Sequence, residues 1–251
     1  MSDESAGVQV ALERVWASLT EHGYALTDDR AIGCPDRFRE NFRETYFNDA
    51  TLRCDEGDKP ADRRRARDVI RYQWRDDDLD VWEHETITIT DRGGMAGPRD
   101  HARVRLLDDP RGEAFVRALL ALVPPFQRQS DGTFGVNLFR TFTDVVTTPH
   151  NDHEQFCVFY VLNRVGEGAE TYLYDAGATT GQAKWRAEPV LRHQLNPGEI
   201  IIFKDDLFKH GATPLIPPPG RTAMRDALIC TVDHPETYLA PTTEAQASHP
   251  R

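Results

Sequence analysis

The sequence carries two histidines and one aspartate whose types and spacing suit a metal site. His150 and Asp152 lie two positions apart in the run Thr148–Asp152, and His210 follows much further along the chain. On an extended strand, residues two apart point to the same face, so His150 and Asp152 can bind one metal ion from one side. A histidine from a distant strand completes a facial set that leaves coordination positions open for oxygen and a cosubstrate. This pattern predicts an oxygen-activating iron site.

Each of these residues also has an ordinary structural interpretation. The chain contains nine histidines, so a His-x-Asp triplet arises readily by chance and is a weak motif alone. Its context favours a ligand pair, because the apolar run 156–162 follows and places both side chains at the mouth of a core. His153 and Glu154 compete by proximity, although on a strand His153 would point away from His150. Zinc accepts the same ligand types, so zinc-dependent hydrolysis is an alternative.

Arg225 opens the last apolar run of the chain, 226–232, and shares a strand face with Ala227 and Ile229. A guanidinium that points into a β-barrel needs an anion, and a carboxylate that accepts two hydrogen bonds is its best partner. The alternative is an arginine that reaches water from the start of a strand. Arg221, on the preceding loop, is a second candidate for binding the same anion.

The first half of the chain mixes helical and strand-like patterns. Apolar residues recur at helical spacing in three segments, and shorter runs between Asp-rich turns are typical of strands. The expected elements are helices over Ser5–His22, after Pro35 and over Glu113–Leu122, and strands over Asp68–Trp74 and Val81–Thr90.

Strand-like runs dominate after Gly132, with Gly-rich or Pro-rich turns between them. This spacing favours an antiparallel sandwich or jelly roll over alternating strand–helix–strand units. We therefore expect a mainly β, α+β fold, in which the helices flank one outer sheet face and the metal candidates lie at strand ends. The strands expected in this half are Phe134–Val146, Gln155–Asn163, Thr171–Tyr174, Val190–Gln194, Glu199–Phe203 and Ala227–Val232.

Composition and length limit the class of protein. The 251 residues, 39% apolar and 28% charged, are typical of one globular domain, and the net charge of -11 argues against nucleic-acid or anionic-membrane partners. The acidic N-terminus lacks the features of a secretory signal, and no run is apolar for long enough to span a membrane. We expect a cytoplasmic single domain over 1–251, with a helical and β support region (1–130), a β core with the metal site (131–235) and a tail (236–251).

Further motifs follow one another in a fixed order around the metal candidates. They are Pro149–Asp152 with Phe156, Gly168–Asp175, Pro197–Asp206, His210–Pro214 and Arg225–Leu228. On these residues the sequence resembles the iron(II) and 2-oxoglutarate-dependent oxygenases. Within them it is similar to the small bacterial family of free amino-acid hydroxylases that includes the L-isoleucine hydroxylases. In the first half, only the Arg63–Tyr72 stretch is similar to that family.

The resemblance implies a double-stranded β-helix, a jelly-roll or cupin-like core that uses Fe(II), 2-oxoglutarate and O2. It implies His150, Asp152 and His210 as the iron ligands, and Arg225 as the anchor for the distal carboxylate of 2-oxoglutarate.

The position two after Arg225 departs from the family pattern. It is Ala227, where many members have a serine or threonine that also contacts the distal carboxylate. Thr213 or Thr141 can supply the missing hydroxyl, and Arg221 remains the alternative arginine.

The resemblance also implies hydroxylation of an unactivated C–H bond in a small molecule, with a free L-amino acid or a derivative as the expected substrate, and release of succinate and CO2. A free amino acid needs a cation for its carboxylate and an acid for its ammonium group. Arg140, with Arg71 as alternative, is the candidate for the carboxylate, and Glu154 or Asp144 for the ammonium group. A homodimer is one candidate assembly.

Two other functions compete with this one. A cupin-type metal-dependent dioxygenase or isomerase keeps the fold and the metal without 2-oxoglutarate, and does not need Arg225. A metal-free jelly-roll binding module takes up no iron and tolerates the loss of His210.

Overall fold

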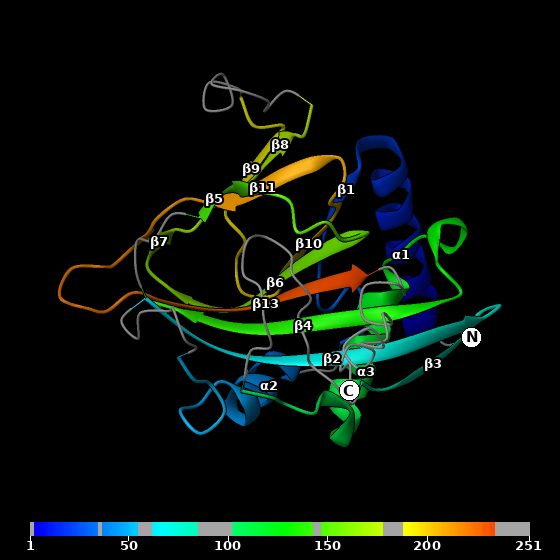
Figure 1. Ribbon diagram of the computed structural model, residues 1–251, viewed down its shortest axis with the longest axis horizontal. Helices are drawn as coiled ribbons and strands as arrows, with labels where there is room; N and C mark the ends of the chain where they lie inside the picture. The colour runs from blue at the N-terminus through cyan, green and yellow to red at the C-terminus, as the bar shows by residue number, and fades with distance from the viewer. Residues whose placement is uncertain are drawn as a thin grey trace, which may run out of the picture.

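A seven-stranded antiparallel sheet lies at the centre of the computed structural model, which describes residues 3–34, 37–54, 62–84, 102–142, 147–177 and 188–233. Its strand order is β1-β10-β6-β13-β4-β2-β3. A smaller sheet, ordered β5-β11-β8-β9, lies on one side of it, and α2 and α3 lie on the other (Figure 1). Two facing antiparallel sheets form the double-stranded β-helix expected from the sequence.

The elements have the following bounds. The helices are α1 (Asp3–His22), α2 (Phe38–Tyr46) and α3 (Pro110–Ala121), with short 3-10 turns η1 (Leu106–Asp108) and η2 (Pro125–Gln127). The strands are β1 (Tyr24–Asp28), β2 (Arg63–Arg75), β3 (Asp78–Glu83), β4 (Asp131–Thr141), β5 (Thr147–His150), β6 (Phe156–Val165), β7 (Glu167–Gly168), β8 (Thr171–Asp175), β9 (Leu191–His193), β10 (Glu199–Lys204), β11 (Phe208–Ala212), β12 (Leu215–Ile216) and β13 (Met224–Asp233).

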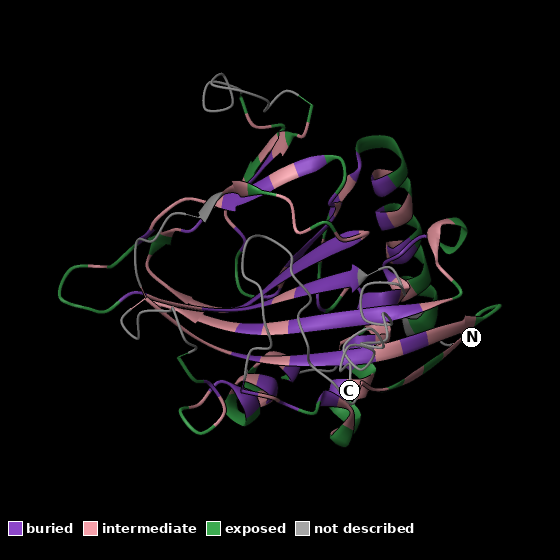
Figure 2. Ribbon diagram, viewed as in Figure 1, coloured by how far each residue is buried: buried purple, intermediate pink, exposed green. Residues whose placement is uncertain are grey.

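Alternate side chains of the large sheet pack into two different hydrophobic cores. On β6, Val158 and Tyr160 belong to the core shared with the helices, whereas Phe159 and Val161 belong to the core between the two sheets. Because successive strand residues point to opposite faces, a strand buried on both sides must be apolar throughout. This explains the continuous apolar run in β6, and Figure 2 shows the resulting buried band across the central strands.

The helix layer is fixed by a cap and an aromatic cluster. Asp109 accepts a hydrogen bond from the backbone N–H of Arg111, and a proline follows it at the first position of α3, as is typical of a helix start. Phe115 of α3 then stacks on Phe38 of α2 and on Tyr160 of β6, with ring centroids 5.4 and 5.8 Å apart. These contacts confirm that the helices cover the outer face of the large sheet.

The sequence-based elements are largely confirmed, with two main differences. β2 begins at Arg63 rather than Asp68, so the N-terminal half supplies β1, β2 and β3 to the large sheet. The short strands β1, β5, β7, β11 and β12 were not predicted. The ends of two predicted strands (85–90 and 143–146) and the proposed tail lie outside the described residues, and the division into support region, core and tail remains a prediction.

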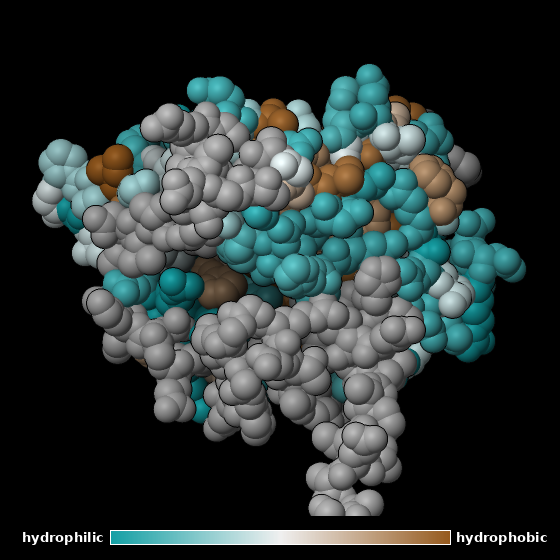
Figure 3. Space-filling model, turned by 45° about the horizontal axis from the view of Figure 1, so that its top comes forward, coloured by the Kyte–Doolittle hydropathy of each residue, from teal (hydrophilic) through white to brown (hydrophobic). Residues whose placement is uncertain are grey.

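None of the described helices combines the length and apolar character needed to cross a lipid bilayer. On the face shown in Figure 3, hydrophilic residues predominate among the described ones, and hydrophobic residues form small groups.

Truncation of Leu228 tests the double-sided core. This side chain is fully buried among the outer-face residues of β13, so Leu228→Ala should lower the free energy of unfolding by about 2–5 kcal/mol. Leu26→Ala, on the edge strand β1, is the matched control. That side chain is 42% exposed, so its truncation should change the free energy of unfolding by no more than about 0.5 kcal/mol. Urea denaturation of both variants gives the comparison, and equal losses would contradict the assigned core.

Candidate metal centre and active site

His150 and His210 face each other across two paired strands. β5 and β11 are antiparallel, and these two residues are direct partners in their register. Directly opposite residues share a sheet face, so both imidazoles project to the same side, with ring centroids 4.4 Å apart. The register of β5 with β11 therefore brings together two residues that are distant in sequence.

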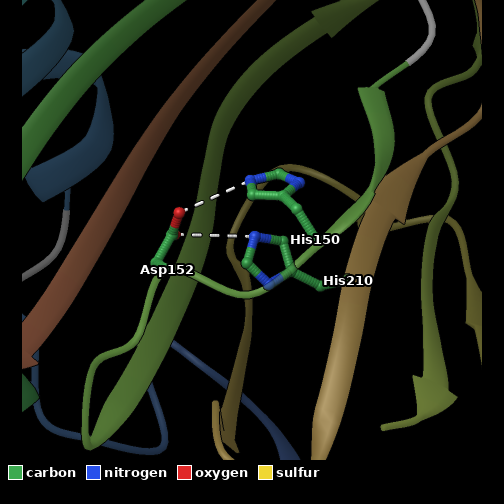
Figure 4. Close-up of side chains that lie close together, drawn as sticks. All are labelled: His150, Asp152 and His210. Atoms are coloured by element: carbon green, nitrogen blue, oxygen red, sulfur yellow. Dashed lines mark ion pairs between the residues drawn. The ribbon is translucent and has the colours of Figure 1, made fainter. Parts of the chain in front are cut away.

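Asp152 reaches the same point from a turn. The sequence-based expectation that His150 and Asp152 share one strand is wrong, because β5 ends at His150. His153 has a positive φ of 63°, which turns the chain towards β6. The Asp152 carboxylate nevertheless faces both imidazoles from one side: Oδ1 is 3.4 Å from His150 Nε2, and Oδ2 is 3.6 Å from His210 Nε2 (Figure 4).

The separations suit one metal ion. One ligand atom from each of the three residues can be chosen so that all lie within 4.8 Å of one another. A divalent ion with bonds of about 2.0–2.2 Å to three facial ligands places those atoms roughly 3 Å apart. Small movements therefore convert the present arrangement into a coordination set. Two imidazoles and one carboxylate form the donor set typical of non-haem Fe(II) oxygenases.

The electrostatic environment keeps Asp152 ionised. Burial alone would raise the pKa of its carboxyl, but the hydrogen bond from His150 and the charges of His210, His150 and Arg67 lower the pKa below its ordinary value overall. An ionised carboxylate is the form that binds a metal.

Two polar residues hold the cluster in place. The Asn151 side-chain amide donates to the backbone carbonyls of Asp205 and Phe208, at 2.6 and 2.5 Å, which ties the turn after β5 to the turn before β11. Asp205 is fully buried, and its Oδ1 lies 3.4 Å from His210 Nδ1, an ion-pair distance without the alignment of a hydrogen bond. A carboxylate behind a ligand histidine orients the ring and leaves Nε2 directed at the metal.

A second group of possible ligands shares His210. Cys157, Asp205 and His210 have ligand atoms within the same 4.8 Å limit, and all three residues are buried. Cys157 and Asp205 do not line the cavity described below, so a metal held there would have no access for a substrate. The first cluster is therefore the better candidate for catalysis.

The first cluster opens into a cavity of about 370 Å³ between the two sheets. Its sides are formed by one row of residues from each of β2, β4 and β13, together with β11. Phe139, Phe159 and Ile229 supply apolar walls. A space of this volume falls within the range of small-molecule sites.

Arg225 points into this cavity and lacks a partner for one end of its side chain. Its Nη2 is buried and makes no hydrogen bond to the described residues. Burial, and then the charge of Arg164 on the neighbouring strand, lower the pKa of Arg225 to about 10, so the guanidinium stays charged at neutral pH. A buried cationic donor without a partner is suited to a carboxylate ligand.

Thr141 lies directly opposite Arg225 on β4 and also lines the cavity. It can therefore supply the hydroxyl that Ala227 lacks. The other two candidates do not fit this role. Arg221 is exposed on the loop before β13, and Thr213 accepts a hydrogen bond from the backbone N–H of Glu170; neither lines the cavity.

Arg140 does not fit its predicted role as the substrate-carboxylate anchor. Its guanidinium donates two hydrogen bonds to the buried Asp226, at 2.7 and 2.9 Å, and lies over the ring of Phe47 on the helix side of the sheet. Arg140 and Thr141 are adjacent on β4 and therefore face opposite sides. The ion pair with Asp226 gives Arg140 a structural role on the helix side of the sheet.

The remaining substrate candidates also lie elsewhere. Arg71 is packed against Trp82, further along β2, and Glu154 donates its backbone N–H to Asp205. Neither residue lines the cavity. Asp144 lies outside the described residues.

Three arginines of β2, unlike these candidates, lie on the cavity. Arg63, Arg65 and Arg67 all line the cavity, and none was assigned a role from sequence. Their spacing of two residues was the available signal, because it predicts a common strand face. The signal was missed because the strand was expected to begin only at Asp68, whereas β2 begins at Arg63.

Comparison with known proteins supports the same chemistry. Residues 56–231 match the family model described as 2OG-Fe dioxygenase. No curated protein matches the chain.

Several solved structures share the fold. A bsmA homolog from Methylobium petroleophilum PM1 is 21% identical, with a TM-score of 0.67 over 90% of this chain and 93% of that one. IDO from Bacillus thuringiensis is 17% identical, with a TM-score of 0.64 over 89% and 95% of the two chains. The Fe(II)/(alpha)ketoglutarate-dependent dioxygenase TqaL is 13% identical, with a TM-score of 0.66 over 91% and 89%.

Removal of the Asp205 charge tests its positioning role. Asp205→Asn keeps the size of the side chain but weakens the orientation of His210, so Fe(II) affinity should fall about 10- to 100-fold. Asp206→Asn is the matched control, since Asp206 is the exposed neighbour. Anaerobic Fe(II) titration gives both affinities, and an unchanged affinity in Asp205→Asn would contradict the role.

Proposed function

The chain belongs to the 2OG-Fe dioxygenase family, and we propose that it hydroxylates an unactivated C–H bond of a free L-amino acid or a close derivative. Members of the family are enzymes that use Fe(II), 2-oxoglutarate and O2. The observation that carries the proposal is the joint position of His150, Asp152, His210 and Arg225 on one cavity of small-molecule size.

In this proposal, His150, Asp152 and His210 hold the iron. Their facial arrangement occupies one side of the ion and leaves the other side open towards the cavity. Bound Fe(II), with 2-oxoglutarate and O2, supplies the oxidising power for the C–H bond. Asp205 and Asn151 keep the ligand side chains in place from behind.

Arg225 binds the distal carboxylate of 2-oxoglutarate, assisted by the Thr141 hydroxyl. The buried Nη2 gains the partner that it lacks, and the carboxylate gains a charge-assisted hydrogen bond. Because Arg225 is fixed on a central strand, it sets the direction in which 2-oxoglutarate enters the site.

The apolar walls and β2 orient the substrate. Phe139, Phe159 and Ile229 exclude water beside the metal and leave room for the aliphatic part of a small molecule. The arginines of β2 offer partners for the substrate carboxylate in place of Arg140. An amino acid presents the two features that this lining can bind, a carboxylate and a C–H-rich side chain.

Family membership sets the competing functions aside. A cupin-type enzyme without 2-oxoglutarate, a zinc hydrolase and a metal-free binding module do not belong to a family defined by iron and 2-oxoglutarate. Arg225 also favours 2-oxoglutarate use, since the cupin-type alternative leaves its buried charge without a function.

Anaerobic addition of 2-oxoglutarate to the Fe(II)-loaded protein tests the proposal. Chelation of the iron should produce a visible charge-transfer band. His210→Ala should abolish the band, and Arg225→Ala should need about 10- to 100-fold more 2-oxoglutarate, because a hydrogen bond between charged groups is lost.

Two exposed residues provide matched controls. His22→Ala, at the end of α1, and Arg221→Ala, on the loop before β13, should both leave the titration unchanged. A wild-type protein that binds iron but gives no band would contradict the assigned 2-oxoglutarate site. The assignment would also be contradicted if Arg221→Ala raised the 2-oxoglutarate concentration needed for the band as much as Arg225→Ala does.

A further inference from the structure

The second group of possible metal ligands shares only His210 with the proposed iron triad. Cys157 lies at the start of β6, Asp205 follows the end of β10, and His210 lies in β11. Antiparallel pairing places Cys157 directly opposite Phe203 of β10, two residues before Asp205. One ligand atom from each of the three residues lies within 4.8 Å of the other two. The fold thus brings a thiol, a carboxylate and an imidazole together at one buried point.

Two polar atoms of this group make no hydrogen bond to the residues that the structure describes. Asp205 is fully buried, and its Oδ2 accepts the backbone N–H of Glu154, but its Oδ1 is one of these two atoms. The other is Nδ1 of His210, a residue that is only 4% exposed. A buried carboxylate oxygen and a buried ring nitrogen lose free energy unless a partner binds them.

The distance between these two atoms suits a shared ion. Asp205 Oδ1 and His210 Nδ1 are 3.4 Å apart. A tetrahedral ion with bonds of about 2.0–2.1 Å to oxygen and nitrogen holds the two ligand atoms about 3.3 Å apart. A hydrogen bond between such atoms is usually shorter, at about 2.7–3.2 Å. The pair is therefore already spaced as two ligands of one ion, with the Cys157 sulfur as the third.

The donor set favours a softer ion than Fe(II). A thiolate ligand favours ions such as Zn²⁺, whereas two imidazoles and one carboxylate suit non-haem iron. When the ion binds, it replaces the proton of the Cys157 thiol, which is released. The thiolate and the carboxylate then cancel the two positive charges of the ion. This neutrality suits the apolar surroundings, because Phe159 and Phe203 pack on the His210 ring, each with its centroid 5.2 Å away.

We propose that Cys157, Asp205 and His210 form a second metal site, which binds a thiophilic divalent ion such as Zn²⁺ or Cd²⁺ and excludes Fe(II) from the triad. The exclusion follows from His210, which belongs to both groups. A neutral imidazole has one acceptor nitrogen, so His210 can hold two ions at once only if it loses its last ring proton. The second site stands on its own geometry, whereas its inhibitory effect rests on the proposed function.

Titration of the metal-free protein with Cd²⁺ tests the second site. Coordination by a thiolate produces an ultraviolet charge-transfer band, and Cys157→Ala should abolish it, because the sulfur ligand is lost. Cys230→Ala is the matched control, since Cys230 is equally buried but lies in the core shared with the helices. Cys54→Ser removes an exposed thiol. Both control variants should keep the band.

Two further variants separate the second site from the triad. His150→Ala should leave the Cd²⁺ affinity unchanged, because His150 belongs to the triad alone. Asp205→Asn should lower the Cd²⁺ affinity about 10- to 100-fold, because a charged ligand is lost. If Cys157→Ala does not fold, Cys157→Ser keeps the size of the side chain and makes the same test.

Competition with iron tests the exclusion. In the wild type, bound Cd²⁺ should raise the Fe(II) concentration needed for the visible band with 2-oxoglutarate by about 10-fold or more. In Cys157→Ala, the same Cd²⁺ concentration should have a much smaller effect, because only direct competition for the triad remains.

The outcomes distinguish this inference from the proposed function. A wild type without the ultraviolet band, a band that survives in the Cys157 variants, or a band lost in His150→Ala would each overturn the second site. Equal suppression of iron loading by Cd²⁺ in the wild type and in Cys157→Ala would overturn the exclusion. Failure to form the visible band in the absence of Cd²⁺ instead contradicts the proposed function itself.

Discussion

The two-residue period of the β-strands determines where each functional side chain of this protein lies. The large sheet is covered by helices on one face and by the smaller sheet on the other, so neighbouring residues of one strand enter different environments. Thr141 lines the cavity, whereas Arg140 forms an ion pair on the helix side. A shift of one residue in strand register would exchange these faces, and the apolar residues of both cores resist such a shift.

The active-site region depends on charges that the surrounding structure holds in place. Asp226 neutralises Arg140 on the outer face, and Asp205 lies behind His210. Arg225 and the β2 arginines instead direct their charge into the cavity, where the family's cosubstrate brings a dianion. The fold thus separates Arg140, which forms an ion pair on the outer face, from the arginines that line the cavity.

The fold and the group of His150, Asp152 and His210 could be predicted because apolar patterns and residue types are visible in the sequence. Strong apolar periodicity identified the long strands and the three helices, and His150, Asp152 and His210 were recognised from their types and order. The short strands β5 and β11 carry too few residues for a periodic signal, and their pairing is a tertiary property. The positions of the arginines were harder to predict, because the face of Arg140 depends on the register of β4 with β13. The cavity-facing row of β2 was missed because the strand was expected to begin only at Asp68.

The central claim is that His150, Asp152 and His210 hold the iron and that Arg225 binds 2-oxoglutarate. The most direct test is a crystal structure of the anaerobic complex with Fe(II) and 2-oxoglutarate. The account predicts a metal about 2.0–2.2 Å from the Nε2 atoms of both histidines and from a carboxylate oxygen of Asp152, with the distal carboxylate of 2-oxoglutarate on Arg225. A metal bound instead by Cys157, Asp205 and His210, or a 2-oxoglutarate carboxylate placed away from Arg225, would contradict it.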